Sequence, residues 1–283
     1  FLKYAAENGH AIAQYMVGIL YEKGVGTEID LKKAKEFLMM SAYNNNDQGQ
    51  LCLGRFYKRH FPRDKKKMKI AFELFTKSAN QGNNQAFFEL ALCYESKGDY
   101  QEMFKYLKKA SNSNNPAAQF RLACFYFQGR FIEKNEKKAF ELFNLSSFHG
   151  VPETFFYLGI CYEFGKGTGK DLKKALNYYR KCAELQIKTS FDANIKLGNW
   201  YEYGKKEISI IKDDEIALKY YKNASQIFDA PSKTKIDFKN ETLFYILHLD
   251  PQLIDNFIDQ IEIENDPFIS FPMLYLLIGE YLL

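Results

Sequence analysis

The sequence predicts an all-α, right-handed solenoid of about six helix–loop–helix repeats, followed by a C-terminal helical extension. Three observations predict this fold: a tyrosine recurs at a nearly constant interval, tiny and aliphatic residues precede it at fixed distances, and small residues recur in the segment that follows it. The recurring tyrosines, 32 to 39 residues apart, are Tyr21, Tyr57, Tyr94, Tyr126, Tyr162 and Tyr201.

Each of these tyrosines lies near the end of a predicted first helix. A tiny residue stands three positions before it, an aliphatic residue four positions before it and a small residue eight positions before it, so all of them share one side of a helix. Glycine inside a helix costs about 1 kcal/mol relative to alanine, so we expect the tiny residue to let the backbone of a neighbouring helix come close. The tiny residues are Gly18, Gly54, Ala91, Ala123, Gly159 and Gly198.

A second helix is predicted after each loop. Small residues recur in it eight positions apart, as Ala34 and Ala42 do, and aromatic residues lie between them. Small residues a little over two turns apart form a seam against which another helix packs. The third repeat keeps only Tyr106 and Ala110 of this pattern, after a shortened loop.

The stretch GKGTGKDLKKA, residues 165–175, resembles a phosphate-binding loop at first sight. A P-loop needs four residues between its first glycine and the Gly-Lys pair, a Ser or Thr after the lysine, and a preceding strand. Here three residues separate Gly165 from Gly169, Asp171 follows the lysine, and the preceding segment is predicted to be a helix. Residues 24–34 match the stretch but have no lysine at the position of Lys170. We therefore interpret both stretches as turns between antiparallel helices.

The turn interpretation makes two local predictions. A glycine just past the first helix adopts the left-handed conformation, which costs little only for glycine. Asp30 and Asp171 then accept hydrogen bonds as N-caps of the second helix. The glycines predicted to be left-handed are Gly24, Gly129, Gly165 and Gly204.

The repeat resembles the Sel1-like repeat, a relative of the tetratricopeptide repeat. Residues 13–37, AQYMVGILYEKGVGTEIDLKKAKEF, match its pattern of Ala-Gln, Leu-Gly, Tyr, a Gly-x-Gly loop, Asp and Lys-Ala, and residues 154–179 match almost as closely. The resemblance covers residues 1–226 and is weakest in the second and third repeats. It implies a solenoid fold and a role as an adaptor or regulator, as in other members of this family.

The repeat pattern ends after residue 226. Asp250 and Pro251 are typical of a helix start, and an apolar stripe follows them. We therefore divide the chain into a Sel1-like repeat solenoid, 1–226, and an acidic helical tail, 227–283. The tail is expected to cap or continue the array, and the natural chain is expected to extend beyond it.

Charge is unevenly distributed along the chain. Residues 241–283 contain eight acidic residues and no Lys or Arg, whereas residues 1–240 have a net charge of +12. This asymmetry suggests either contact between the two parts or an anionic partner for the first.

The five cysteines form no Cys-x-x-Cys pair and lie among apolar residues, so we interpret them as buried thiols in a reducing compartment. This favours the cytoplasm, while three Asn-x-Ser/Thr sequons leave the secretory pathway and the ER lumen open. The longest apolar run, 273–283, is shorter than a bilayer requires, so no membrane span is expected in this segment.

No arrangement of residues predicts catalysis, a metal site or a cofactor. The four histidines match no metal-ligand spacing, and no cysteine has a recognisable histidine partner, so a small hydrolase is only a distant alternative. The basic run RDKKKMK, residues 63–69, is interpreted as a solvated face rather than a nucleic-acid or acidic-lipid site. No polar residue recurs as in RNA-reading repeats.

Partner contact is predicted on the first helices. Residues six positions before each tyrosine point partly into a groove if the first helices line the concave side, although packing between neighbouring first helices explains them equally well. Positions just after the tyrosine are more exposed by the same geometry, and aromatic rings beside cations suit an acidic peptide. The first group supplies Tyr15, Phe88, Phe120 and Phe156, and the second supplies Phe127, Phe164 and Tyr203 with Lys58, Arg59 and the nearby Arg55.

These features predict a non-catalytic scaffold or adaptor that holds partner proteins or peptides, acidic ones among them, and no nucleic acid. The resemblance implies one alternative, in which the repeats are a regulatory arm of a larger enzyme such as a protein kinase or a ubiquitin-ligase complex. The sequence leaves the oligomeric state open.

Overall fold

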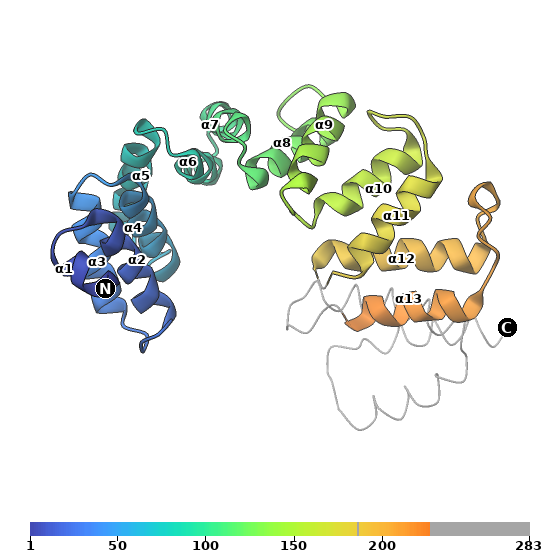
Figure 1. The fold of residues 1–283 in the computed structure, drawn as a ribbon. Coiled ribbons are helices and arrows are strands. Elements are labelled where there is room, and N and C mark those ends of the chain that lie inside the picture. Colours follow the sequence, from blue (N-terminus) through green and yellow to red (C-terminus); the bar gives the residue numbers. More distant parts are fainter. Residues whose placement is uncertain (186, 227–283) are drawn as a thin grey trace, which may run out of the picture. The chain divides into compact units, whose positions relative to one another are not determined.

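The computed structural model describes residues 1–185 and 187–226, so the predicted tail, 227–283, lies outside the described residues together with its helix start at Asp250. In the described ranges the regular structure is helical apart from one isolated bridge between Lys205 and Ile210. The chain divides into two compact units, Phe1–His149 and the part that begins at Gly150 (Figure 1).

The first unit contains one leading helix and four antiparallel helix pairs. Its helices are α1 (Leu2–Glu7), α2 (Ala11–Lys23), α3 (Leu31–Tyr43), α4 (Asp47–His60), α5 (Lys65–Asn80), α6 (Asn84–Ser96), α7 (Tyr100–Asn112), α8 (Pro116–Gln128) and α9 (Glu136–Phe148). The helices of each pair pack against each other, and each second helix but the last, α9, also packs against the first helix of the next pair. This arrangement buries successive clusters of core residues along the unit.

The second unit repeats the arrangement with two further pairs. Its helices are α10 (Thr154–Phe164), α11 (Leu172–Ala183), α12 (Lys188–Tyr203) and α13 (Asp214–Gln226), with a short 3₁₀ helix, η1 (Lys206–Ile208), in the last loop. The six helix pairs of the described chain confirm the predicted repeat number and the all-α solenoid class. None of these helices is long and apolar enough to cross a membrane.

Residues 165–175 form the turn between α10 and α11, as predicted. Gly165 ends α10 in the left-handed conformation, with φ 68° and ψ 30°. The carboxylate of Asp171 accepts a hydrogen bond from the backbone N–H of Lys174 at 3.0 Å, and this bond holds the pKa of Asp171 below its usual value. The backbone N–H of Asp171 also donates to the carbonyl of Tyr162 at 2.8 Å, which closes the turn.

The first copy of the turn confirms the same predictions, and the sixth corrects one of them. Asp30 caps α3 through the N–H of Lys33 at 2.9 Å, and Gly24 and Gly129 are left-handed like Gly165. Gly204 has φ 73° but ψ 160°, so its predicted left-handed conformation is wrong. The loop after it is longer and folds back through the bridge from Lys205 to Ile210 before α13 begins.

The glycines before the repeat tyrosines make room mainly for a side chain, whereas a close backbone was expected; at Gly18 the backbone oxygen of Ala34 also lies 3.1 Å from an added Cβ. A Cβ added to Gly159 would lie 2.4 Å from the ring of Tyr179, and one added to Gly54 would lie 2.5 Å from the ring of Phe75. Tyr179 and Phe75 project from the second helix of the same repeat and are fully buried. The glycine therefore fixes how closely the helices of one pair approach.

The repeat tyrosine and the Lys-Lys-Ala sequence meet in one contact. The ring of Tyr162 stacks on Tyr178 of the second helix, with centroids 5.7 Å apart. The ammonium of Lys174 lies 5.2 Å from the Tyr162 centroid, within the range of a cation–π interaction. Lys33 lies over Tyr21 in the same way at 5.5 Å, so the motif joins the two helices of a repeat.

The glutamine of the Ala-Gln pair joins successive repeats. The side-chain amide of Gln14, which is buried, donates to the carbonyl of Ala6 in the preceding helix at 3.1 Å. Gln119 does the same to Ser111 at 3.4 Å. The last turn of a helix leaves carbonyls without intrahelical partners, and here such a carbonyl accepts both a backbone N–H of the following loop and this side chain.

Candidate functional site

The four predicted contact residues six positions before a repeat tyrosine are half-buried and pack inwards. Tyr15, Phe88 and Phe156 each contact a hydrophobic core cluster of their own unit. The ring of Phe120 lies 6.0 Å from that of the buried Phe143. These four side chains hold the helices together and leave only part of their surface for a partner.

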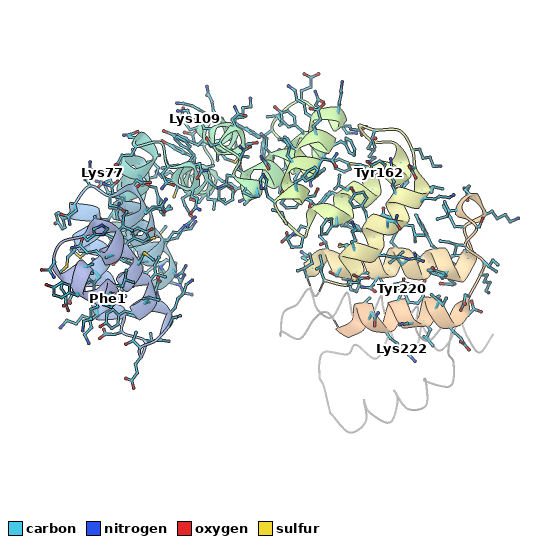
Figure 2. The ribbon with its side chains drawn as sticks, in the orientation of Figure 1. Phe1, Lys77, Lys109, Tyr162, Tyr220 and Lys222 are labelled. Carbon is cyan, nitrogen blue, oxygen red and sulfur yellow. The ribbon has the colours of Figure 1, made fainter. Side chains whose placement is uncertain are left out.

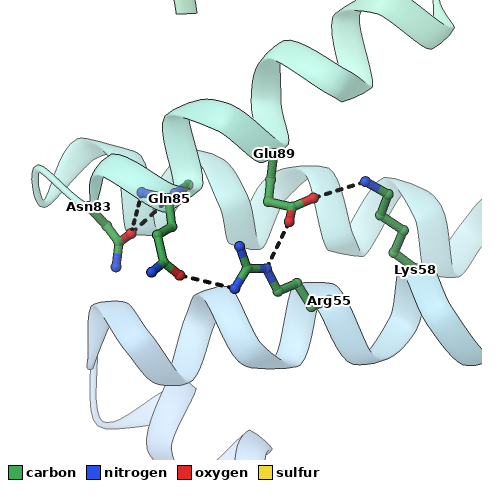
Figure 3. A network of polar contacts seen from close by, with 6 residues as sticks. Arg55, Lys58, Asn83, Gln85 and Glu89 are labelled. Carbon is green, nitrogen blue, oxygen red and sulfur yellow. Dashed lines mark hydrogen bonds and ion pairs between the residues drawn. The ribbon is translucent and has the colours of Figure 1, made fainter. Parts of the chain in front are cut away.

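Arg55 and Lys58 are held by an acidic residue of the next first helix. The guanidinium of Arg55 lies 2.8 Å from one carboxylate oxygen of Glu89, and the ammonium of Lys58 lies 2.9 Å from the other (Figure 3). Arg55 also donates to the side-chain oxygen of Gln85 at 3.0 Å. Burial alone would raise the pKa of Glu89, but the two cations outweigh it and hold that pKa below its usual value.

Arg59 pairs with an acidic residue of the preceding first helix rather than the following one. Its guanidinium lies 2.6 Å from a carboxylate oxygen of Glu22 on α2, and the imidazole of His60 lies 2.9 Å from the same oxygen. The side chain of Glu22 is only 8% exposed. The basic end of α4 is therefore neutralised largely from within the protein, by one glutamate on each side.

Similar ion pairs recur at one register between consecutive first helices. In each, the residue after a repeat tyrosine pairs with the residue five positions before the next repeat tyrosine. The pairs are Lys58 with Glu89 at 2.9 Å, Glu95 with Arg121 at 2.9 Å and Glu163 with Lys196 at 3.2 Å. Sequence reasoning missed them because the signs are reversed in the first pair, so neither position keeps one residue type. Opposite charge at the two positions is the signal.

Glu89→Gln tests this polar contact. Because the native pKa of Glu89 lies below its ordinary value of 4.5, ionisation stabilises the fold above pH 4.5, and this contribution is lost as the pH falls through the native pKa. We expect the substitution to lower the free energy of unfolding by about 1 to 2 kcal/mol at neutral pH. The difference from wild type should shrink below pH 4.5 in urea titrations. Glu141→Gln, at an exposed position, is the control, and an equal loss in both variants would contradict the assignment.

The positions after the tyrosine differ in exposure. Phe127 is half-buried, with its ring 6.0 Å from that of Phe143. Phe164, the last residue of α10, is 57% exposed, and Tyr203, the last residue of α12, is 73% exposed. Of the predicted aromatic contacts, Phe164 and Tyr203 are the ones that present most of their ring to solvent.

Two lysines flank the exposed ring of Phe164. The ammonium of Lys196, from α12, lies 5.2 Å from the ring centroid, and that of Lys166, from the following turn, lies 5.8 Å from it. Lys196 is also paired with Glu163, whose carboxylate accepts a hydrogen bond from the hydroxyl of Tyr179 at 2.7 Å. A short surface at the junction of α10 and α12 thus combines an exposed aromatic ring with cationic side chains.

Three of the five thiols have a raised pKa. Burial raises the pKa of Cys52 to about 11 and also raises those of Cys93 and Cys182, so thiolates are scarce at neutral pH. Within residues 1–185 and 187–226, no three His, Cys, Asp or Glu side chains come together as a metal site would require.

The Sel1 repeat family model matches residues 11–46, 55–83, 116–147, 156–186 and 191–226. The chain belongs to the Sel1-repeat family. The matched ranges leave out the α6–α7 pair, where the loop between the two helices is shortest.

Relatives of this Sel1-repeat protein occur in bacteria and fungi. It is 25% identical over 288 residues to an uncharacterized protein of Neisseria meningitidis serogroup B. The match covers 78% of this chain and 61% of that protein. It is 26% identical over 264 residues to the chitin synthase regulator SKT5 of Saccharomyces cerevisiae. This match covers 86% of this chain and 37% of SKT5. The chain thus spans less than two thirds of the length of either relative.

Solved structures share the fold of this Sel1-repeat protein. The protective antigen c5321 of uropathogenic Escherichia coli, which displays an SLR fold, is similar with a TM-score of 0.66 and 25% identity. The match covers 87% of this chain and 55% of the antigen.

Proposed function

We propose that this Sel1-repeat protein is a non-catalytic scaffold or adaptor that binds partner proteins or peptides on the first-helix surface of its second unit. The observation that carries the proposal is Phe164, an aromatic ring that is 57% exposed where α10 meets α12. Large aromatic side chains contribute much of the binding energy at protein interfaces, and this one lies beside two ammonium groups.

The surface suggests the chemistry of the partner. Phe164 and Tyr203 occupy equivalent positions on successive first helices and supply two apolar anchors. Lys166 places a cation beside the first anchor. A segment with two apolar side chains and a carboxylate between them would use all three groups. The acidic part of this preference rests on the ammonium of Lys166, which lies 5.8 Å from the centroid of the Phe164 ring.

Affinity capture from the native organism with Phe164→Ala tests the proposal. We expect the variant to lose a partner that wild type retains, with affinity lowered at least about tenfold, because an interface anchor contributes about 1 to 2 kcal/mol or more. Phe164→Tyr should keep the partner. Ile211→Ala removes an 82% exposed side chain of the same unit and serves as the matched control. Identical captured proteins for wild type and Phe164→Ala would contradict the assignment.

A regulatory arm of a larger enzyme is the second candidate. SKT5 is named as a regulator of chitin synthase, and the present chain matches only 37% of its length. Under this reading the same surface would hold an enzyme rather than an unrelated adaptor partner. Co-purification of an enzyme whose turnover changes on addition of the repeat protein, but not of Phe164→Ala, would support it.

A further inference from the structure

Most of the net charge of the first unit lies on its second helices. α3, α5, α7 and α9 together contain thirteen lysines, no arginine and five acidic residues, a net charge of +8. The first helices of the unit, α2, α4, α6 and α8, contain five Lys or Arg and four acidic residues, a net charge of +1. The basic character noted along the sequence is therefore concentrated on one layer of helices, here called the second-helix face.

The charges of the two layers also differ in their partners. The arginines of the first helices are paired with glutamates of neighbouring first helices. On the second-helix face, ion pairs within the described ranges involve Lys33 and Lys105. Eight of the thirteen lysines have neither an ion pair nor a ring contact with the described residues: Lys32, Lys35, Lys65, Lys66, Lys69, Lys77, Lys108 and Lys137.

These lysines point away from the core. α3, α5 and α7 each pack against the first helices of their own and the next pair, and α9 packs against α8, so the opposite side of every second helix faces outward. Seven of the eight are exposed, Lys35 being half-buried. Lys77, one of the eight, is labelled on α5 in Figure 2. The charge is spread over four helices rather than gathered in one pocket.

Large apolar side chains share this face. On α3 the exposed side reads Lys32, Glu36, Met40 and Tyr43, and Tyr43 is 84% exposed. On α9 the equivalent positions are Lys137, Glu141, Leu145 and Phe148, and Phe148 is 88% exposed. Each stripe thus begins with a lysine and ends with an aromatic residue.

The arrangement does not serve folding. Unpaired lysines on one face repel one another where they lie within a Debye length, which is about 10 Å at 0.1 M salt. Lys65, Lys66 and Lys67 occupy the first turn of α5, where the helix dipole disfavours positive charge. A binding partner that brings negative charge would relieve both effects.

We propose that the second-helix face of the first unit docks on an anionic lipid bilayer. This face includes Lys65, Lys66 and Lys69 of the basic run that the sequence alone assigned to a solvated face. An ammonium group is a hydrated point charge, whereas arginine is preferred where phosphates or carboxylates are read in a fixed geometry. Thirteen lysines without an arginine therefore fit a diffuse anionic surface better than a nucleic acid or a defined acidic peptide. The exposed Met40, Tyr43, Leu145 and Phe148 can enter the headgroup region, as apolar residues of interfacial helices do. This surface is separate from the one around Phe164.

Vesicle co-sedimentation of the full chain tests the proposal. The probes are phosphatidylcholine vesicles with and without about 30% phosphatidylserine. We expect wild type to bind the anionic vesicles at least about tenfold more tightly than the neutral ones, and to be released as salt rises from about 0.05 M to about 0.5 M. Lys66→Glu, Lys69→Glu and Lys77→Glu in one variant should abolish the preference.

The control carries the same change in net charge on exposed residues of the second unit: Lys188→Glu, Lys206→Glu and Lys212→Glu. It should bind anionic vesicles nearly as wild type does. All six lysines are exposed, so melting temperatures measured by circular dichroism should agree among the three proteins. Equal binding of wild type to both vesicles, equal loss in both variants, or binding to polyglutamate without binding to vesicles would overturn the proposal.

Discussion

Gly159→Val is expected to lower the free energy of unfolding by about 3 kcal/mol, the upper part of the range for overpacking a core. Even a single added Cβ would lie 2.4 Å from the ring of Tyr179, and valine adds two methyl groups beyond it. The ring cannot move aside easily, because it is fully buried and its hydroxyl is bonded to Glu163. The higher helix propensity of valine, a few tenths of a kcal/mol, is too small to offset the clash. Urea titration followed by circular dichroism measures the change.

Gly169→Val in the neighbouring turn is the matched control. Gly169 has no atom within 4 Å of an added Cβ, and its φ lies outside the left-handed range. It should therefore change stability by only a few tenths of a kcal/mol. Similar losses at both positions would mean that backbone freedom, rather than the room left for Tyr179, explains the glycine in α10.

Phe75→Ala is expected to cost about 4 kcal/mol, within the range for phenylalanine in a core. Phe75 is fully buried in α5 and its ring fills the space left by Gly54 of α4. In a repeat array each repeat contacts only its neighbours, so the destabilisation should remain local. Hydrogen exchange monitored by mass spectrometry should accelerate across α4 to α6 and leave α10 to α13 nearly unchanged.

Phe148→Ala provides the comparison for this experiment. The side chain is of the same type but 88% exposed, so its removal should leave both stability and exchange almost unaffected. Uniform acceleration over both units in Phe75→Ala would contradict the expectation that the repeats behave as nearest-neighbour units.

Much of the architecture is readable from the sequence because it depends on local spacing. The interval between tyrosines marks the repeat, and the N-caps Asp30 and Asp171 need only the bonds that their own turns provide. The left-handed Gly165 follows from the same local geometry. Gly204 departs from it because a longer loop changes the path of the chain after α12.

The role of the tiny residues depends on how two helices are rotated against each other, and spacing along one helix does not contain that information. The ring that faces Gly159 comes from Tyr179, twenty positions later.

The ion pairs between first helices were missed for another reason. Lys58 with Glu89 and Glu163 with Lys196 conserve opposite charge but not residue type, so inspection of single positions does not reveal them.

The exposed fractions of the side chains leave a smaller contact surface than the sequence predicted. The ten predicted residues lie on first helices as expected, but the side chains of eight of them are used in packing or ion pairs, as Phe156 and Arg55 show. Whether a residue at a given helical position is covered depends on its neighbours in the next repeat. Phe164 and Tyr203 became the leading candidates only once their exposed fractions were known.

Site-specific photo-crosslinking tests the central claim most directly. p-Benzoyl-phenylalanine placed at Phe164 keeps an aromatic ring at the junction of α10 and α12, and the same group placed at Ile211 samples another exposed position of that unit. The proposed scaffold function predicts a crosslink from position 164 to the captured partner and none from position 211. A crosslink from position 211 alone, or equal yields from both positions, would contradict binding on the first-helix surface.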